Sequence, residues 1–106
     1  MTSSTAEGLS LAAQKQFEGL RLRFAAGLQA RWIDISQAAD ASTQQVLLHR
    51  LCGSAGSYGF DRLGHLASQA ELLCASGDGM ALAQCLSQIE AEIKVATHTQ
   101  SLPNTL

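Results

Sequence analysis

The chain has 106 residues, with seven Lys and Arg, nine Asp and Glu, and a formal net charge of −2. That length fills one compact domain and leaves no room for a second, and the small charge gives no field that would attract nucleic acid or an anionic membrane. Segment 1–8 lacks the basic and apolar regions of a signal peptide, and no apolar run approaches a membrane span. We therefore expect a cytoplasmic single-domain protein that binds neither nucleic acid nor membranes.

The composition predicts an all-α fold. Apolar content comes mainly from Leu and Ala, which favour helices, and the single proline is Pro103. The three cysteines, Cys52, Cys74 and Cys85, are odd in number and lack the C-x-x-C or Cys/His spacing of a metal site. We therefore expect reduced thiols, with neither a disulfide framework nor a structural zinc ion.

The first predicted helix begins near Leu9 and continues to Ile35, because apolar residues recur there every three or four positions. The expected stripe consists of Phe17, Leu20, Phe24, Leu28, Arg31 and Ile35, with Trp32 beside it. Arg21, Arg23 and Arg31 are interpreted as the solvated edge of this helix, with aliphatic stems that cover apolar surface. The pattern ends a few residues after Ile35.

A second helix is predicted from the sequence Ser-Thr-Gln-Gln, which starts at Ser42 and matches the S-x-x-Q capping box. Ser42 would be the N-cap, and His49 would lie near the middle of the helix. Gly59 ends the regular pattern and is a plausible C-cap. The residues expected to face the core are Leu47, Leu48, Leu51, Ala55 and Tyr58.

Two further helices follow. Asp61 is expected to cap the third, and the turn at 76–79 separates it from the fourth, which should fray after Val95. The inward residues of the third helix are Leu63, Leu66, Ala67, Ala70 and Leu73. Those of the fourth are Leu82, Cys85 or Leu86, Ile89 and Ile93.

Short links between amphipathic helices favour antiparallel neighbours. The chain is therefore predicted to form an antiparallel up-down four-helix bundle over 9–97, and this arrangement leaves room for a short extra N-terminal helical segment across one end. A flexible N-terminus (1–8) and a flexible C-terminal tail (98–106) are expected to flank the bundle.

Glycines occur four, seven and ten residues after His49, inside an otherwise helical stretch. Each costs a helix interior roughly 1 kcal/mol relative to alanine, so local stability does not explain them. At about 100° per residue, Gly53 lies roughly 40° to one side of His49 and Gly56 roughly 20° to the other. Cys52 and Gln45 fall on the same arc. The surface beside the imidazole is therefore predicted to be nearly bare, so that another protein could bring a reacting group to it.

The sequence from Leu48 to Phe60, LHRLCGSAGSYGF, resembles the signature of histidine-containing phosphotransfer (HPt) domains. The resemblance extends into the next helix through Leu63, Leu66, Ala67 and Glu71. It implies a helical bundle with an exposed phosphoacceptor histidine, and His49 stands at that position. Glu71 stands where the family keeps a carboxylate or amide near the histidine, and could orient the ring.

The resemblance also implies the partners of the chain. These would be response-regulator receiver domains and a hybrid sensor kinase, with the receiver supplying Mg²⁺ and the acidic pocket. The chain itself would need no cofactor and would act as a monomeric phosphoryl carrier, not as an enzyme, in a two-component phosphorelay. A neutral imidazole is already a competent nucleophile, and alignment with charge stabilisation does most of the work of phosphoryl transfer.

One departure from the family pattern concerns Cys52. The family often has a lysine three residues after the histidine, where its ammonium group can steady the phosphoryl oxygens. Cys52 carries no such charge. This substitution keeps a second function open, a non-phosphorylated HPt-like adaptor that binds receiver domains or another signalling protein.

Other site types fit the sequence less well. The dimerisation helices of sensor kinases resemble His-Glu followed by a proline, whereas His49 is followed by Arg50. A metal-binding bundle needs inward Glu and Glu-x-x-His pairs, and cysteine catalysis needs an oxyanion donor and a cleft, none of which can be identified. His65 and His98 lack the glycine surroundings of His49, and we assign them no role.

Overall fold

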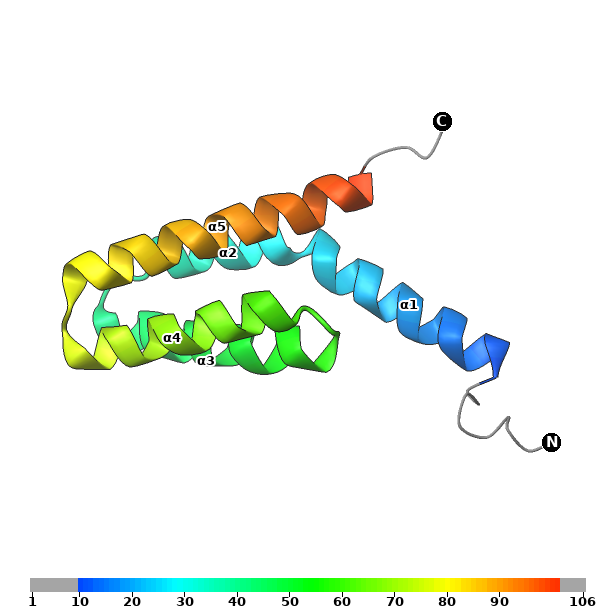
Figure 1. The fold of residues 1–106 in the computed structure, drawn as a ribbon, viewed down its shortest axis with the longest axis horizontal. Helices are drawn as coiled ribbons and strands as arrows, with labels where there is room; N and C mark the ends of the chain where they lie inside the picture. The colour runs from blue at the N-terminus through cyan, green and yellow to red at the C-terminus, as the bar shows by residue number, and fades with distance from the viewer. Residues whose placement is uncertain (1–9, 102–106) are drawn as a thin grey trace.

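The computed structural model describes residues 10–101, with the side chains described through His98, and this range contains helices but no strand. The five helices are α1 (Leu11–Ala26), α2 (Leu28–Ser36), α3 (Ala41–Ser57), α4 (Asp61–Ser76) and α5 (Gly79–Ser101). Helices α2 to α5 run up and down beside one another as a four-helix bundle, while α1 projects from one end (Figure 1). The predicted all-α bundle is therefore confirmed. The predicted flexible segment 1–8 and residues 102–106 of the predicted tail lie outside the described residues.

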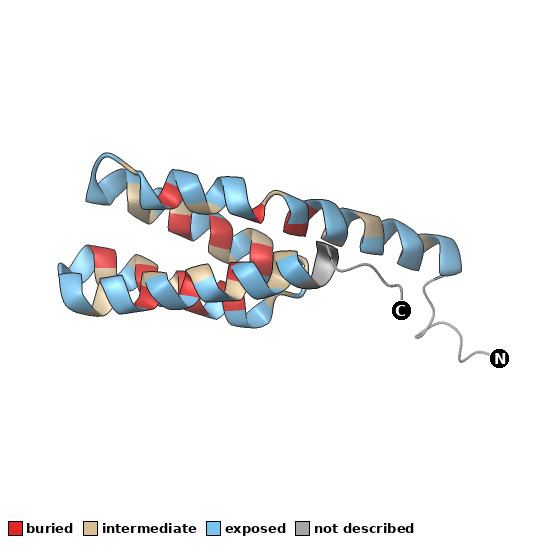
Figure 2. Ribbon diagram, turned by 90° about the horizontal axis from the view of Figure 1, so that it is seen from above, coloured by how far each residue is buried: buried red, intermediate tan, exposed pale blue. Residues whose placement is uncertain are grey.

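The predicted first helix is not continuous, because it is interrupted at Gly27. There the backbone has φ −90° and ψ −1°, and the Gly27 N–H donates to the carbonyls of Phe24 and Arg23 at 3.1 and 3.2 Å. The extra N-terminal segment is thus a full helix, α1. Phe17 and Leu20, predicted to be inward, are 45% and 40% exposed because α1 runs past the end of the bundle (Figure 2).

Helix α3 begins two residues earlier than predicted, with Asp40 and not Ser42 as its N-cap. The Thr43 N–H donates to the Asp40 carboxylate at 2.7 Å, and this hydrogen bond holds the pKa of the Asp40 carboxyl below its usual value. Asp and Ser are comparably good N-caps, so the capping-box pattern alone did not separate them. The expected cap of α4 is also wrong by one position, since Asp61 is its first residue and Phe60 is the N-cap.

The connection between α3 and α4 is tight because Gly59 adopts a left-handed conformation, with φ +83°. Its N–H donates to the Gly56 carbonyl at 3.3 Å, and the Phe60 N–H donates to the Ala55 carbonyl at 2.8 Å. This is the Schellman pattern, and it satisfies two carbonyls at the helix end. Gly77, with φ +79°, ends α4 in the same region of conformational space, within the predicted turn.

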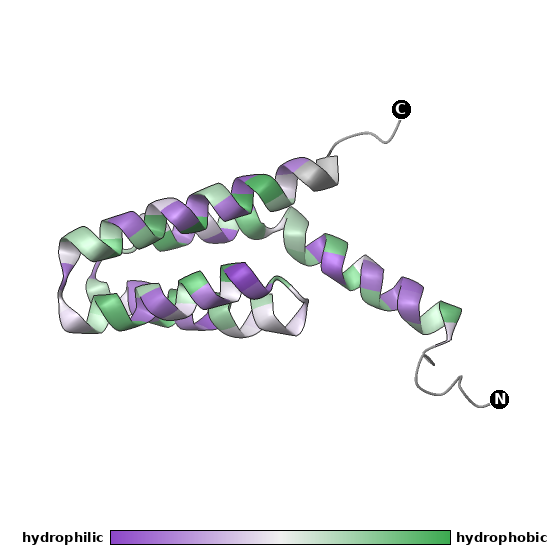
Figure 3. Cartoon of the chain, in the orientation of Figure 1, coloured by the Kyte–Doolittle hydropathy of each residue, from purple (hydrophilic) through white to green (hydrophobic). Residues whose placement is uncertain are grey.

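All five helices contribute to one core, whose residues lie on the sides of the bundle helices that face one another (Figure 2). Hydrophilic and hydrophobic residues are mixed along the projecting part of α1 (Figure 3). The predicted inward residues of the last three helices are buried or partly buried. The buried set is Phe24, Ala25, Leu28, Ile35, Leu48, Leu51, Ala55, Leu63, Leu66, Ala67, Ala70, Cys74, Cys85, Ile89 and Ile93.

Helix α5 continues to Ser101. The prediction that this helix frays after Val95 is therefore wrong. Ile93 is fully buried and Ala96 packs against the core, so contacts with the bundle stabilise the helix beyond Val95. No described helix is both long enough and apolar enough to cross a membrane.

Candidate functional site around His49

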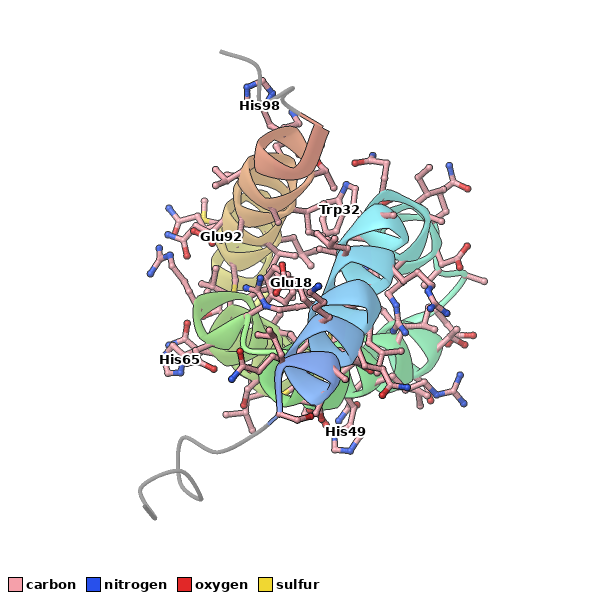
Figure 4. All side chains as sticks on the ribbon, turned by 90° about the vertical axis from the view of Figure 1, so that its right-hand side faces the viewer. Glu18, Trp32, His49, His65, Glu92 and His98 are labelled. Carbon is pink, nitrogen blue, oxygen red and sulfur yellow. The ribbon has the colours of Figure 1, made fainter. Side chains whose placement is uncertain are left out.

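His49 projects from the outer face of α3, and its side chain is 74% exposed. Figure 4 shows the imidazole pointing away from the bundle. The buried residues of the same helix are Leu48, Leu51 and Ala55. The exposure follows from the helical repeat, because the position after a core residue lies about 100° away from the core direction. The ring is thus accessible to a partner protein.

Glu71 of α4 holds one ring nitrogen of His49. Both carboxylate oxygens of Glu71 lie 3.1 Å from Nδ1 of His49, and the glutamate side chain is only 25% exposed. A carboxylate can only accept hydrogen bonds, so the interaction places the ring proton on Nδ1. In the neutral imidazole the lone pair is then on Nε2, the nitrogen on the opposite side of the ring from Glu71. The contact expected for an orienting residue is therefore present.

Gly64, which the sequence argument did not single out, allows α4 to approach α3 closely enough for this contact. A Cβ atom at Gly64 would lie 3.4 Å from the Cys52 carbonyl oxygen and 3.5 Å from the Gly56 nitrogen. A Cβ atom there would thus be in ordinary van der Waals contact with the α3 backbone, so the two helices lie close together at Gly64. Glu71 is seven residues, or about two turns, after Gly64 and so shares its face of α4. An isolated glycine inside a helical pattern is the only sequence signal for this role.

Gly53 and Gly56 have a different role from Gly64. Both are exposed, and a Cβ atom at either position would have no neighbouring atom within 4 Å among the described residues. Packing within the bundle does not require them. What the two glycines provide is a low surface beside His49, as the sequence predicted.

Cys52 and Gln45, the other predicted neighbours, are both half-buried. The Cys52 side chain packs partly against the core cluster, so it contributes less to the exposed surface than its helical position suggested. All three cysteines are free. Burial raises the pKa of the Cys74 and Cys85 thiols, and the negative charge of Glu71 raises that of Cys74 further.

On the side of α3 that faces α2, His49 borders a shallow open hollow. Besides His49, the residues that line it are Arg31, Arg50, Gly53, Ser54, Ser57 and Tyr58. We call this feature the arginine hollow. Arg31 comes from α2, and the helical pattern of its own segment gave no sign that it would lie beside α3.

Arg21 connects α1 to the end of this hollow through two contacts. It was predicted to be solvated, but it is half-buried. Its Nε atom donates to the Tyr58 carbonyl at 2.9 Å, and its guanidinium carbon lies 4.5 Å from the centre of the Phe60 ring. Phe24 stacks on Tyr58, with ring centres 5.1 Å apart. These contacts fix α1 against the turn between α3 and α4.

The remaining histidines lie elsewhere. Figure 4 shows His65 on α4 and His98 on α5 on different sides of the molecule from His49. Among the side chains described for residues 10–98, no group of three His, Cys, Asp or Glu could hold a metal ion. His49 combines exposure, a carboxylate partner and a cleared surface.

A four-helix bundle that presents one carboxylate-bound histidine on an outer face has the architecture of a phosphotransfer module. The family model of the Hpt domain matches residues 11–98, and the chain therefore belongs to the Hpt domain family. Members of this family carry phosphoryl groups in two-component signalling systems and interact with receiver domains. No curated protein and no solved structure matches the chain.

Proposed function

We propose that this chain is a histidine phosphotransfer protein that accepts a phosphoryl group on His49 from a receiver-domain aspartate and passes it to a second receiver. The observation that carries the proposal is the state of the His49 ring. Its Nδ1 is engaged by Glu71 at 3.1 Å, which leaves the lone pair on Nε2, and the side chain is 74% exposed.

The proposed step requires no base from this chain. The Nε2 lone pair attacks phosphorus, the N–P bond forms, and the acyl phosphate P–O bond of the receiver breaks to release its aspartate carboxylate. The ring becomes a phosphorylated imidazolium that keeps its proton on Nδ1, and the Glu71 carboxylate stabilises that positive charge. In the reverse direction an aspartate carboxylate attacks phosphorus and the N–P bond breaks.

The chain thus acts as a phosphoryl carrier, and most of the catalysis comes from its partner. Alignment and charge neutralisation dominate phosphoryl transfer, and we assign the Mg²⁺ ion and the acidic pocket to the receiver domain. The flat surface over Gly53 and Gly56 lets that pocket reach the imidazole. We place this activity in the cytoplasm and expect the chain to act as a monomer, with a hybrid sensor kinase as a source of phosphate.

Cys52 favours one alternative function. It occupies the position where the family often has a lysine, and its side chain is half-buried and has no cationic group. A chain that has lost charge assistance at this position could bind receivers, or another signalling protein, without being phosphorylated. Phosphate uptake separates this adaptor function from the phosphotransfer function.

The test is incubation of the purified protein with phosphorylated receiver domains, followed by analysis of the label. Phosphohistidine is labile in acid and stable in base, which distinguishes it from phosphoserine and phosphothreonine. We expect acid-labile label on the wild type and on His65→Gln, and none on His49→Gln. Receiver binding without any label on the wild type would instead support the adaptor function.

A further inference from the structure

The two sides of His49 differ in charge. On the α4 side, Glu71 contacts Nδ1. On the α2 side, the arginine hollow contains Arg31 and Arg50, and no acidic side chain lines it. Because Nδ1 is turned toward Glu71, Nε2 lies on the side of the ring away from α4.

The charges of Arg31 and Arg50 are not compensated within the described residues. Arg62 pairs with Glu92 at 2.9 Å and Lys94 lies 3.9 Å from Glu90, whereas neither arginine of the hollow forms an ion pair with a side chain of residues 10–98. The protein carries a net charge of −2, so this positive region is local and not part of a general basic surface. Such a region attracts a group of opposite charge.

The position of Arg31 is supported by its contacts. Its guanidinium carbon lies 5.2 Å from the centre of the Phe24 ring, and Phe24 is itself buried and stacked on Tyr58. A guanidinium held over an aromatic ring loses less freedom when it forms an ion pair. Three of the residues that line the hollow, Gly53, Ser54 and Ser57, are small, so a partner can come close to both arginines.

We propose that the arginine hollow binds the acidic rim of the receiver domain and orients it over α2 and α3, so that the phosphoryl group reaches Nε2 of His49. Arg31 and Arg50 are positioning residues that act through the partner. This inference rests on the proposed function, and it adds that the receiver docks on the α2 side of His49 and not on the α4 side.

The test compares Arg31→Gln and Arg50→Gln with a matched control, Arg23→Gln, which removes the same charge from an exposed position on α1 outside the hollow. The bimolecular rate constant for transfer from a phosphorylated receiver is measured at low and at high salt. Each hollow variant should be about two- to five-fold slower than wild type at low salt, the size of an exposed ion pair, and the difference should shrink as salt rises. The control should change the rate less than the hollow variants do.

A second measurement uses phosphoramidate, a small phosphoryl donor that needs no docking surface. We expect both hollow variants to be labelled by it at the wild-type rate, with unchanged helical circular dichroism. Equal transfer rates for hollow variants and control would overturn the inference and leave the proposed function standing. Slower labelling by phosphoramidate would also overturn it, because the arginines would then act on His49 itself. A wild type labelled by neither donor would refute the proposed function, and the inference with it.

Discussion

Nδ1 of His49 lies 3.1 Å from each carboxylate oxygen of Glu71, and the contact joins α3 to α4 across the outer surface of the bundle. It determines three properties of the site together. The ring has a defined orientation, its proton is assigned to Nδ1, and a carboxylate stands ready to stabilise the positive charge that phosphorylation of Nε2 creates.

Replacement of Glu71 tests the orienting role. Glu71→Ala should slow phosphate transfer by about three- to ten-fold, the equivalent of one partly exposed charge-assisted hydrogen bond. Glu71→Gln keeps an acceptor oxygen for Nδ1–H, so its transfer rate should lie between those of the wild type and of Glu71→Ala. The ratio of Nδ1 to Nε2 phosphohistidine, measured by ³¹P NMR, should rise in the alanine variant. An alanine variant with wild-type rate and wild-type ratio would show that Glu71 is an ordinary surface acid.

The same substitution at two glycines should have opposite effects on stability. Gly53→Gln replaces a glycine that faces open space with a better helix former, so it should raise the free energy of unfolding by up to about 1 kcal/mol and yet slow transfer. Gly64→Gln places a long polar side chain at a buried position whose Cβ would already touch the α3 backbone, and should lower the free energy of unfolding by about 1–3 kcal/mol. Urea denaturation provides both values. A destabilised Gly53→Gln variant with normal transfer would contradict the docking role of Gly53.

Cys52→Lys restores the cation that the family often has. A cation near the dianionic phosphoryl group should lengthen the lifetime of phosphohistidine by a few-fold at most, since screening limits the gain at a partly exposed site to about 1 kcal/mol or less. Decay of labelled phosphate at low and high salt measures this, and the difference should shrink as salt rises. A wild type that accepts no phosphate beside a Cys52→Lys variant that does would favour the adaptor function.

The N-cap of α3 should make stability depend on pH. The hydrogen bond from the Thr43 N–H lowers the pKa of Asp40, so the folded state favours the ionised carboxylate. This contribution is complete above the carboxyl's usual pKa of 3.8 and is lost as the pH falls through the lower, folded value. Asp40→Ala should therefore lower Tm at neutral pH, and the difference in Tm between the wild type and the variant should decrease below about pH 4. A difference in Tm that stays constant down to pH 2 would exclude Asp40 as the N-cap of α3.

Periodicity was sufficient to predict the last three helices and their core residues, because core contacts there repeat regularly along each helix. The exposure of His49 was predicted from its glycine surroundings and from the resemblance to HPt domains, and its side chain is 74% exposed. Periodicity did not reveal the break at Gly27, since the apolar stripe continues through that residue from Phe24 to Leu28. Ser42 and Asp40 are both good caps, and the choice depended on backbone geometry. The preference for Asp40 became visible only in the folded chain.

Contacts between elements distant in the sequence were beyond prediction. Arg21 and Arg31 were both interpreted as part of the solvated edge of the first predicted helix, and that interpretation did not indicate that Arg21 binds the Tyr58 carbonyl or that Arg31 lines the hollow beside His49. The isolated glycine at position 64 does not indicate by itself which part of the chain lies against it. Each of these roles comes from how the helices pack, which the pattern within one helix does not contain.

The most direct test of the central claim is the site of phosphorylation. The wild-type protein is incubated with a phosphorylated receiver domain, and the product is examined by ³¹P NMR and by mass spectrometry under basic conditions, with His49→Gln as the control. We expect one phosphoryl group on Nε2 of His49 and none on the variant, which should retain the helical circular dichroism of the wild type. Phosphate on His65, on His98 or on a folded His49→Gln variant would contradict the assignment of His49 as the phosphoacceptor.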